Sequence, residues 1–154
     1  PYDRGTWARM VTMVHTEALP GVPSGVGSFC DAREVARALR AAADRGAVGE
    51  NYLLSGPHAS YVELLQLIGA LLDKPVPNKA TPDWMLKLAA WTTDGISRIT
   101  RKEPSITPEG ITHVLSRHDV DDSKARDALG YRHTDLRTLL SDTIDWMREA
   151  GQLQ

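Results

Sequence analysis

The sequence predicts an α/β fold that is mostly helical, with two to four short strands. The first observation is a strand-helix-strand pattern over residues 28–56, the repeating unit of α/β proteins. The second is a series of segments with apolar residues at helical spacing. The third is composition: 154 residues, 42% hydrophobic and 25% charged, can bury one sizeable core. We therefore expect residues 1–154 to form a single unit.

The first elements are a helix over residues 6–19 and a connector over residues 20–27. The apolar periodicity of the first segment ends at a proline-glycine pair. The connector holds two prolines and three glycines, which favour turns. Phe29 and Cys30 then end an apolar stretch that predicts a strand, and we expect Cys30 to be a small buried hydrophobe there.

Asp31 occupies the N-cap position of the next predicted helix. Glu34 follows three residues later, close to a capping box in which the two side chains satisfy free backbone N–H groups. Gly46 ends this helix, and a second strand is expected over residues 51–54.

Ser60 and Glu63 form a full capping box for a helix over residues 60–72. Its apolar face is so broad that the helix must be heavily buried. Val76 is expected to begin a short strand after the turn that ends this helix.

Two helices are predicted to start at a cap residue followed by proline, Thr81-Pro82 and Thr107-Pro108, because a proline at the first helical position loses no hydrogen bond. Trp84, Leu88 and Trp91 share one face of the first of these helices. Asp122 opens a further helix that ends at a glycine, and Thr134 opens the last one.

The charge and cysteine content exclude several functional classes. A net charge of −2 and a pI near 6.2 give no reason to expect nucleic acid or an anionic membrane as a partner. One cysteine excludes an internal disulfide, which favours a cytoplasmic location. No apolar run approaches the ~18 residues of a membrane span.

Two segments carry a resemblance to a known family. Residues 29–36 and 49–56 fit the pattern Phe-x-Asp-x-Arg-(Asp/Glu)-Val-Ala, followed after a helix by Gly-Glu-x-Tyr-Leu-Leu-x-Gly. Residues 122–131 are similar to Asp-Ser-x-Lys-Ala-x-x-x-Leu-Gly-Tyr. In this order the segments resemble the C-terminal half of the extended short-chain dehydrogenase/reductases, the NAD-dependent epimerase/dehydratase family. The resemblance implies the mostly helical, substrate-side lobe of a Rossmann-type protein.

The resemblance also implies NAD or NADP as cofactor, bound by an N-terminal half that is absent from this chain. No Gly-x-Gly-x-x-Gly follows a strand, and no tyrosine has a lysine four residues later, so we expect no catalytic residue in this chain. The first five residues lack an initiator methionine and resemble the middle of a loop, so we expect the C-terminal portion of a longer protein. By the resemblance, Pro1 and Tyr2 would lie beside the cofactor. The family's homodimer would form through helices outside this chain.

Four residues are candidates for binding a small-molecule substrate: Asp31, Arg33, Trp84 and Arg117. Asp31 and Arg33 follow a strand, where clefts form in open α/β sheets, although a helix cap and a solvated arginine explain them more simply. Trp84, with Trp91, is either an aromatic wall for a substrate or, as the helical spacing favours, a packing residue.

A metal site and a hydrolytic triad are both disfavoured. His113 and His118 do not share a helix face, and Asp121 and Asp122 are better explained as a helix cap. No Gly-x-Ser-x-Gly turn is present to support a serine nucleophile, and His133 is expected to be solvated.

Departures from the family pattern bear on the reaction. Members that act on nucleotide-diphosphate sugars carry an arginine before the first motif and Arg-x-Gly-Asp before the last, where this chain has Gly27-Ser28 and residues 116–119. Two charges that would pair with a pyrophosphate are thus not at the expected positions, although Arg117 or Arg33 could take their place. We expect a ketone or aldehyde reductase that resembles dihydroflavonol reductases. A sugar-nucleotide epimerase or dehydratase, and a non-catalytic helical module that binds a ligand or a protein, stay open as alternatives.

Overall fold

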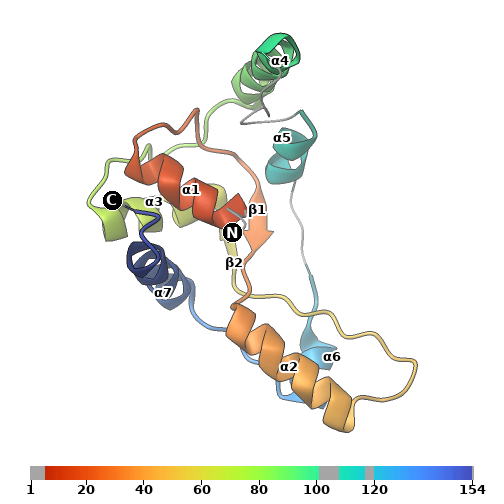
Figure 1. The fold of residues 1–154 in the computed structure, drawn as a ribbon. Coiled ribbons are helices and arrows are strands. Elements are labelled where there is room, and N and C mark those ends of the chain that lie inside the picture. The colour runs from red at the N-terminus through yellow and green to blue at the C-terminus, as the bar shows by residue number, and fades with distance from the viewer. Residues whose placement is uncertain (1–5, 101–107, 117–119, 154) are drawn as a thin grey trace.

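The computed structural model describes residues 6–100, 108–116 and 120–153, and within these ranges it is mostly helical with one small sheet (Figure 1). The elements in chain order are α1 (Thr6–His15), β1 (Val26–Ser28), α2 (Ala32–Arg45), β2 (His58–Ser60), α3 (Tyr61–Leu72), α4 (Asp83–Thr100), α5 (Pro108–Leu115), α6 (Ser123–Leu129) and α7 (Leu136–Glu149). The predicted fold class, α/β with few strands, is confirmed. None of the described helices has the length and apolarity needed to cross a membrane.

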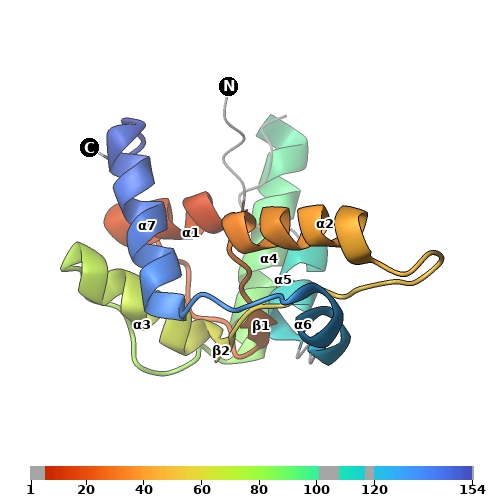
Figure 2. The same ribbon diagram turned by 90° about the horizontal axis from the view of Figure 1, so that it is seen from below.

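The helices gather in three groups around the two strands. Helices α1, α3 and α7 pack together, α2 pairs with α6, and α4 pairs with α5. The α2–α6 pair and the α4–α5 pair lie at opposite ends of the molecule in Figure 1, with the strands between them. Figure 2 shows α7 running across α3 and past one end of α1, and α7 contacts both helices.

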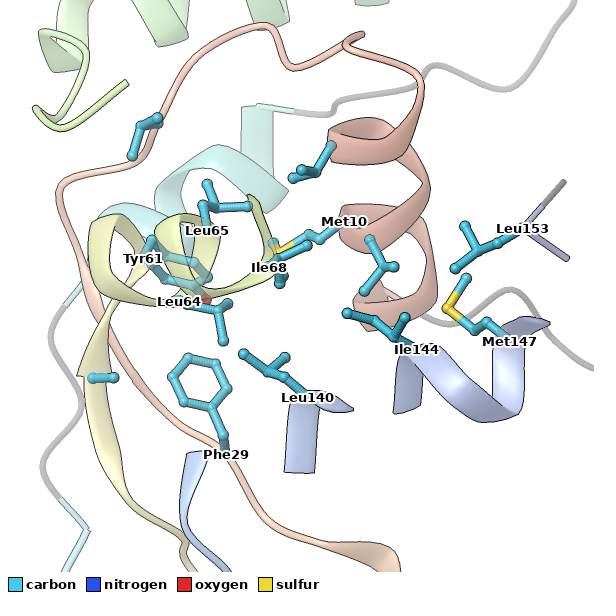
Figure 3. Packing of buried hydrophobic residues seen from close by; sticks show 14 residues of the cluster. Met10, Phe29, Tyr61, Leu64, Leu65, Ile68, Leu140, Ile144, Met147 and Leu153 are labelled. Carbon is cyan, nitrogen blue, oxygen red and sulfur yellow. The ribbon is translucent and has the colours of Figure 1, made fainter. Parts of the chain in front are cut away.

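The main core lies between α1, α3 and α7 (Figure 3). Leu64, Leu65 and Ile68 of α3 are at most 1% exposed, which confirms that this helix is heavily buried. The rings of Phe29 and Tyr61 meet edge to face, with centroids 6.2 Å apart. The predicted capping box is present as well, because Ser60 Oγ accepts from the Glu63 N–H at 3.1 Å and Glu63 Oε2 accepts from the Ser60 N–H at 2.8 Å.

The sheet pairs β1 with β2 antiparallel, with Val26 opposite Ser60 and Ser28 opposite His58. The strands predicted over residues 51–54 and at Val76 are wrong, since neither segment is assigned to a strand. An apolar composition favours extended backbone, but a strand also needs a neighbouring strand to pair with.

Two helix boundaries also differ from the predicted ones. The first helix ends at His15, and Glu17 beyond it has a positive φ of 55°. The last helix is capped by Asp135, whose carboxylate accepts from the Thr138 N–H at 3.0 Å. Thr134 lies outside the helix, and its hydroxyl donates to Asp31 Oδ2 at 3.3 Å.

Candidate functional site

A hollow of about 470 Å³ lies where the start of α2 meets α7. It combines a charged group at its α2 side with apolar side chains along α7. Its lining consists of Cys30, Asp31, Ala32, Arg33, Leu139, Asp142, Thr143 and Trp146. We call this the α2–α7 hollow.

The charged group is an arginine held between two carboxylates. Asp31 caps α2 by accepting from the Arg33 N–H at 2.8 Å, and it also accepts from Arg33 Nε at 3.0 Å and Nη2 at 2.6 Å. Asp142 of α7 accepts from the same Nη2. One positive charge therefore faces two negative charges, and the guanidinium links α2 to α7.

These contacts set the pKa values of the hollow. The Arg33 side chain, through its hydrogen bonds, lowers the pKa of Asp31 to about 2, and Asp31 in turn raises the pKa of Arg33.

The prediction that Cys30 is buried is wrong, because the residue is exposed. Partial burial of its thiol nevertheless raises the pKa, which disfavours a reactive thiolate.

The lowered pKa of Asp31 predicts acid-sensitive stability. A carboxylate with a depressed folded pKa stabilises the fold above its unfolded pKa of 3.8, and this contribution is lost as the pH falls towards about 2. Because Arg33 is itself 58% exposed, solvent screening should hold the contribution to about 1 kcal/mol.

The measurement is the free energy of unfolding of the original chain and of Asp31→Asn as a function of pH. Asparagine keeps an oxygen that can cap the helix. The difference in the free energy of unfolding between the original chain and Asp31→Asn therefore measures the contribution of the negative charge. We expect this difference to be constant above about pH 5 and to shrink as the pH falls towards about 2. Asp127→Asn, an exposed carboxylate on α6, is the control with equal charge change. A pH-independent difference for Asp31→Asn would contradict the assignment.

A second polar cluster surrounds the carboxylate of Asp122, which is 4% exposed. It accepts from Ser55 Oγ at 3.0 Å and from Arg126 Nε at 3.0 Å, and it contacts His133 Nε2. Tyr131 donates its hydroxyl proton to the Ser55 carbonyl at 2.5 Å. His133 is exposed, as predicted, and its ring also contacts the buried carboxylate of Asp122.

This cluster is an anchor rather than a catalytic triad. In a triad the histidine lies between the serine and the carboxylate, whereas here Ser55 and His133 both bind Asp122. Burial opposes ionisation of Asp122, but the hydrogen bonds from His133 and Ser55 outweigh it and lower the pKa. Burial raises the pKa of Tyr131 to about 12, which removes it as a proton donor and acceptor near neutral pH.

The structure brings together two of the four predicted substrate residues, Asp31 and Arg33. Trp84 lies on α4 instead, 66% exposed, and Trp91 is 71% exposed, so the expectation that they are packing residues is wrong. Arg117, and the proposed cofactor neighbours Pro1 and Tyr2, lie outside the described residues. In the part of the chain that is described, no three histidine, cysteine or acidic residues could together hold a metal ion.

Sequence reasoning missed the α7 side of the hollow. Asp142 and Thr143 lie four and three residues before Trp146 on one face of the last helix, a helical spacing that could have indicated a shared surface. It could not have indicated that this surface meets Arg33.

Comparison with known proteins finds several relatives whose names differ from one another. No family model matches the sequence. The chain is 30% identical over 131 residues to sterol demethylase protein B of Methylococcus capsulatus, covering 84% of this chain and 40% of that protein. It is 24% identical over 131 residues to a putative dihydroflavonol 4-reductase of Synechocystis, covering 82% of this chain and 38% of that protein.

Two solved structures share the fold at a TM-score of 0.71. One is the crystal structure of gox2253, 22% identical, matched over 100% of this chain and 47% of that one. The other is PA4631, a nucleoside-diphosphate-sugar epimerase from Pseudomonas aeruginosa, 28% identical, matched over 97% of this chain and 44% of that one.

The chain thus spans less than half the length of these relatives. The family motifs coincide with structural units of the fold: residues 29–36 start α2 and the hollow, and residues 122–131 form α6 with the buried Asp122 cluster. Motifs, fold and relatives agree, and the chain belongs to the extended short-chain dehydrogenase/reductases, the NAD-dependent epimerase/dehydratase family.

Proposed function

We propose that the protein containing this chain is an NAD(P)-dependent oxidoreductase that transfers hydride to the carbonyl carbon of a ketone or aldehyde. This chain would form the substrate side, with the α2–α7 hollow as part of the substrate pocket. The observation that carries the proposal is the charge balance of the hollow, where Arg33 is held by Asp31 and Asp142.

A sugar nucleotide would need cations that are free to bind its pyrophosphate, ideally as two parallel hydrogen bonds from an arginine. Arg33 is already engaged by two carboxylates, and the hollow is otherwise lined mainly by Leu139, Trp146 and small side chains. Such a surface suits an uncharged, largely apolar carbonyl compound. The names of two relatives, a dihydroflavonol reductase and a sterol demethylase protein, support the same substrate class.

The described residues do not form a dinucleotide site. None of the described strands leads through a glycine-rich turn into a helix, which is the arrangement that holds the pyrophosphate of NAD(P). We therefore assign no step of the hydride transfer to this chain. Its residues would bind and orient the substrate and exclude water from it.

The alternative is a sugar-nucleotide epimerase, favoured by the fold shared with PA4631 at 28% identity. Two assays on the protein expressed from its complete natural coding sequence separate the candidates. We expect oxidation of NADH or NADPH with a dihydroflavonol or a 3-ketosteroid. Interconversion of UDP-glucose and UDP-galactose without ketone reduction would favour the epimerase. Binding of a ketone with no turnover in either assay would indicate a non-catalytic module.

A substitution in the hollow then tests the site. Trp146 is 43% exposed at the hollow, and its loss should remove about 1.4 kcal/mol of apolar contact with the substrate, a roughly tenfold rise in KM. We expect kcat of Trp146→Ala to stay within about twofold, because the tryptophan would touch substrate and transition state alike. Trp91→Ala, an exposed tryptophan on α4, should change neither constant. Equal effects of both variants would rule out the hollow as the pocket.

A further inference from the structure

Helix α4 presents an apolar face to solvent. Trp84, Met85, Leu88 and Trp91 are 66%, 46%, 57% and 71% exposed. Trp84, Leu88 and Trp91 recur at the four- and three-residue intervals that place side chains on one side of a helix. We call these four residues the α4 face, and Figure 1 shows α4 at the end of the molecule opposite α2 and α6.

Helix α4 packs against α5 with its other side, so the exposed face is not simply that of an isolated helix. The opposite side of α4 carries Leu86 and Ala90, which are 2% and 0% exposed and pack with Ile111 of α5. At 100° per residue, these two positions lie about opposite Leu88. The orientation of α4 is therefore set by its contact with α5, and that contact leaves the larger apolar side chains outside.

The stretch of sequence that contains this face is basic although the chain is acidic, because residues 79–102 hold five lysines and arginines against two aspartates, a net charge of +3, while the whole chain carries −2. Within this stretch the structure describes the charged side chains of Lys79, Asp83 and Lys87. Lys79 and Lys87 are exposed on either side of the start of the helix. One of the two acids, Asp83, accepts a hydrogen bond from Ser24 at 2.8 Å.

We propose that the α4 face binds the surface of an anionic lipid bilayer, with α4 lying in the plane of the interface. Tryptophan, leucine and methionine on one face with basic residues around them are the pattern of interfacial helices, in which the apolar side enters the headgroup region. Indole rings suit this position because they have an apolar body and a polar N–H.

Charge argues against a second copy as the occupant of this face, and shape argues against a small molecule. A second copy in a symmetric dimer would bring the two basic segments together, which like-charge repulsion disfavours. Small molecules bind in concave sites, whereas the α4 face is a convex helix surface. The net charge of the whole chain, from which the sequence analysis expected no membrane partner, conceals this local excess of positive charge. The inference is independent of the proposed reaction, since α4 contributes no residue to the α2–α7 hollow.

The test is binding of the protein, expressed from its complete natural coding sequence, to vesicles of phosphatidylcholine with and without phosphatidylglycerol. We expect co-sedimentation with the phosphatidylglycerol vesicles, a blue shift of tryptophan emission, and weaker binding at high salt. The double variant Trp84→Ala/Trp91→Ala should weaken the partition at least about tenfold, because two large apolar groups no longer leave water. Its melting temperature should be unchanged, since both residues are exposed.

Trp146→Ala is the matched control, an exposed tryptophan on α7, and should bind vesicles like the original protein. The proposal is wrong if the original protein does not bind anionic vesicles, or if the double variant binds them equally well. It is also wrong if acrylamide cannot quench Trp84 and Trp91 in lipid-free protein, which would mean that another part of the protein covers the face. Self-association without lipid that the double variant abolishes would assign the face to a second copy.

Discussion

Asp122→Ala is expected to lower the free energy of unfolding by about 3 kcal/mol, because it removes the centre of a buried hydrogen-bonded cluster. Asp122 is 4% exposed and Ser55 is 2% exposed. Without the carboxylate, the Ser55 hydroxyl would be left buried with no acceptor. His133 and Arg126 are partly exposed and can turn to water, which keeps the loss below that of a fully buried ion pair.

Chemical denaturation of purified variants measures this effect. Asp122→Asn keeps one acceptor oxygen and should lose roughly half as much stability. Asp127→Ala on the same helix is exposed, and its effect should stay within about 0.5 kcal/mol. If Asp122→Ala and Asp127→Ala had equal midpoints, the cluster would not stabilise the fold.

Gly56→Ala should destabilise the chain by roughly 3 kcal/mol or more, because a Cβ at this position overlaps backbone atoms rather than flexible side chains. The Cβ would collide with the carbonyl group of Phe29 and lie 2.9 Å from the backbone nitrogen of Cys30. Neither atom can move alone, because Gly56 donates its N–H to Ser28 Oγ at 2.8 Å and Phe29 donates its N–H to the Pro57 carbonyl at 3.3 Å. Separating these segments would displace Phe29 from the core.

Gly49→Ala is the matched control for this effect. Gly49 has a positive φ of 83°, and a Cβ added there would have no neighbouring atom within 4 Å. Alanine at this position would therefore strain the backbone without overlapping any other atom. Its cost should be about 1 kcal/mol. The comparison by thermal or chemical unfolding isolates the overlap, and equal losses at the two glycines would show that residues 28–30 and 54–57 separate easily.

The local features of the fold could be predicted from the sequence because neighbours in the chain determine them. The Ser60–Glu63 capping box and the Asp31 cap each form between residues at most three apart. The heavy burial of α3 follows from a helix that is apolar on most sides. The family motifs are also local, and for this reason they identified the family before any contact was known.

Only the tertiary structure decided which surfaces meet. Helix α4 has apolar residues on opposite sides, and the sequence alone favours burial of the side with the tryptophans, but contact with Ile111 of α5 buries Leu86 and Ala90. Asp122 has the position of a helix cap, yet its carboxylate binds Ser55, 67 residues away. From the sequence Arg33 is expected to be solvated, but in the structure it donates a hydrogen bond to Asp142, 109 residues away. In each case local sequence offers two acceptable states, and a contact between distant segments selects one, because only the folded chain supplies the partner.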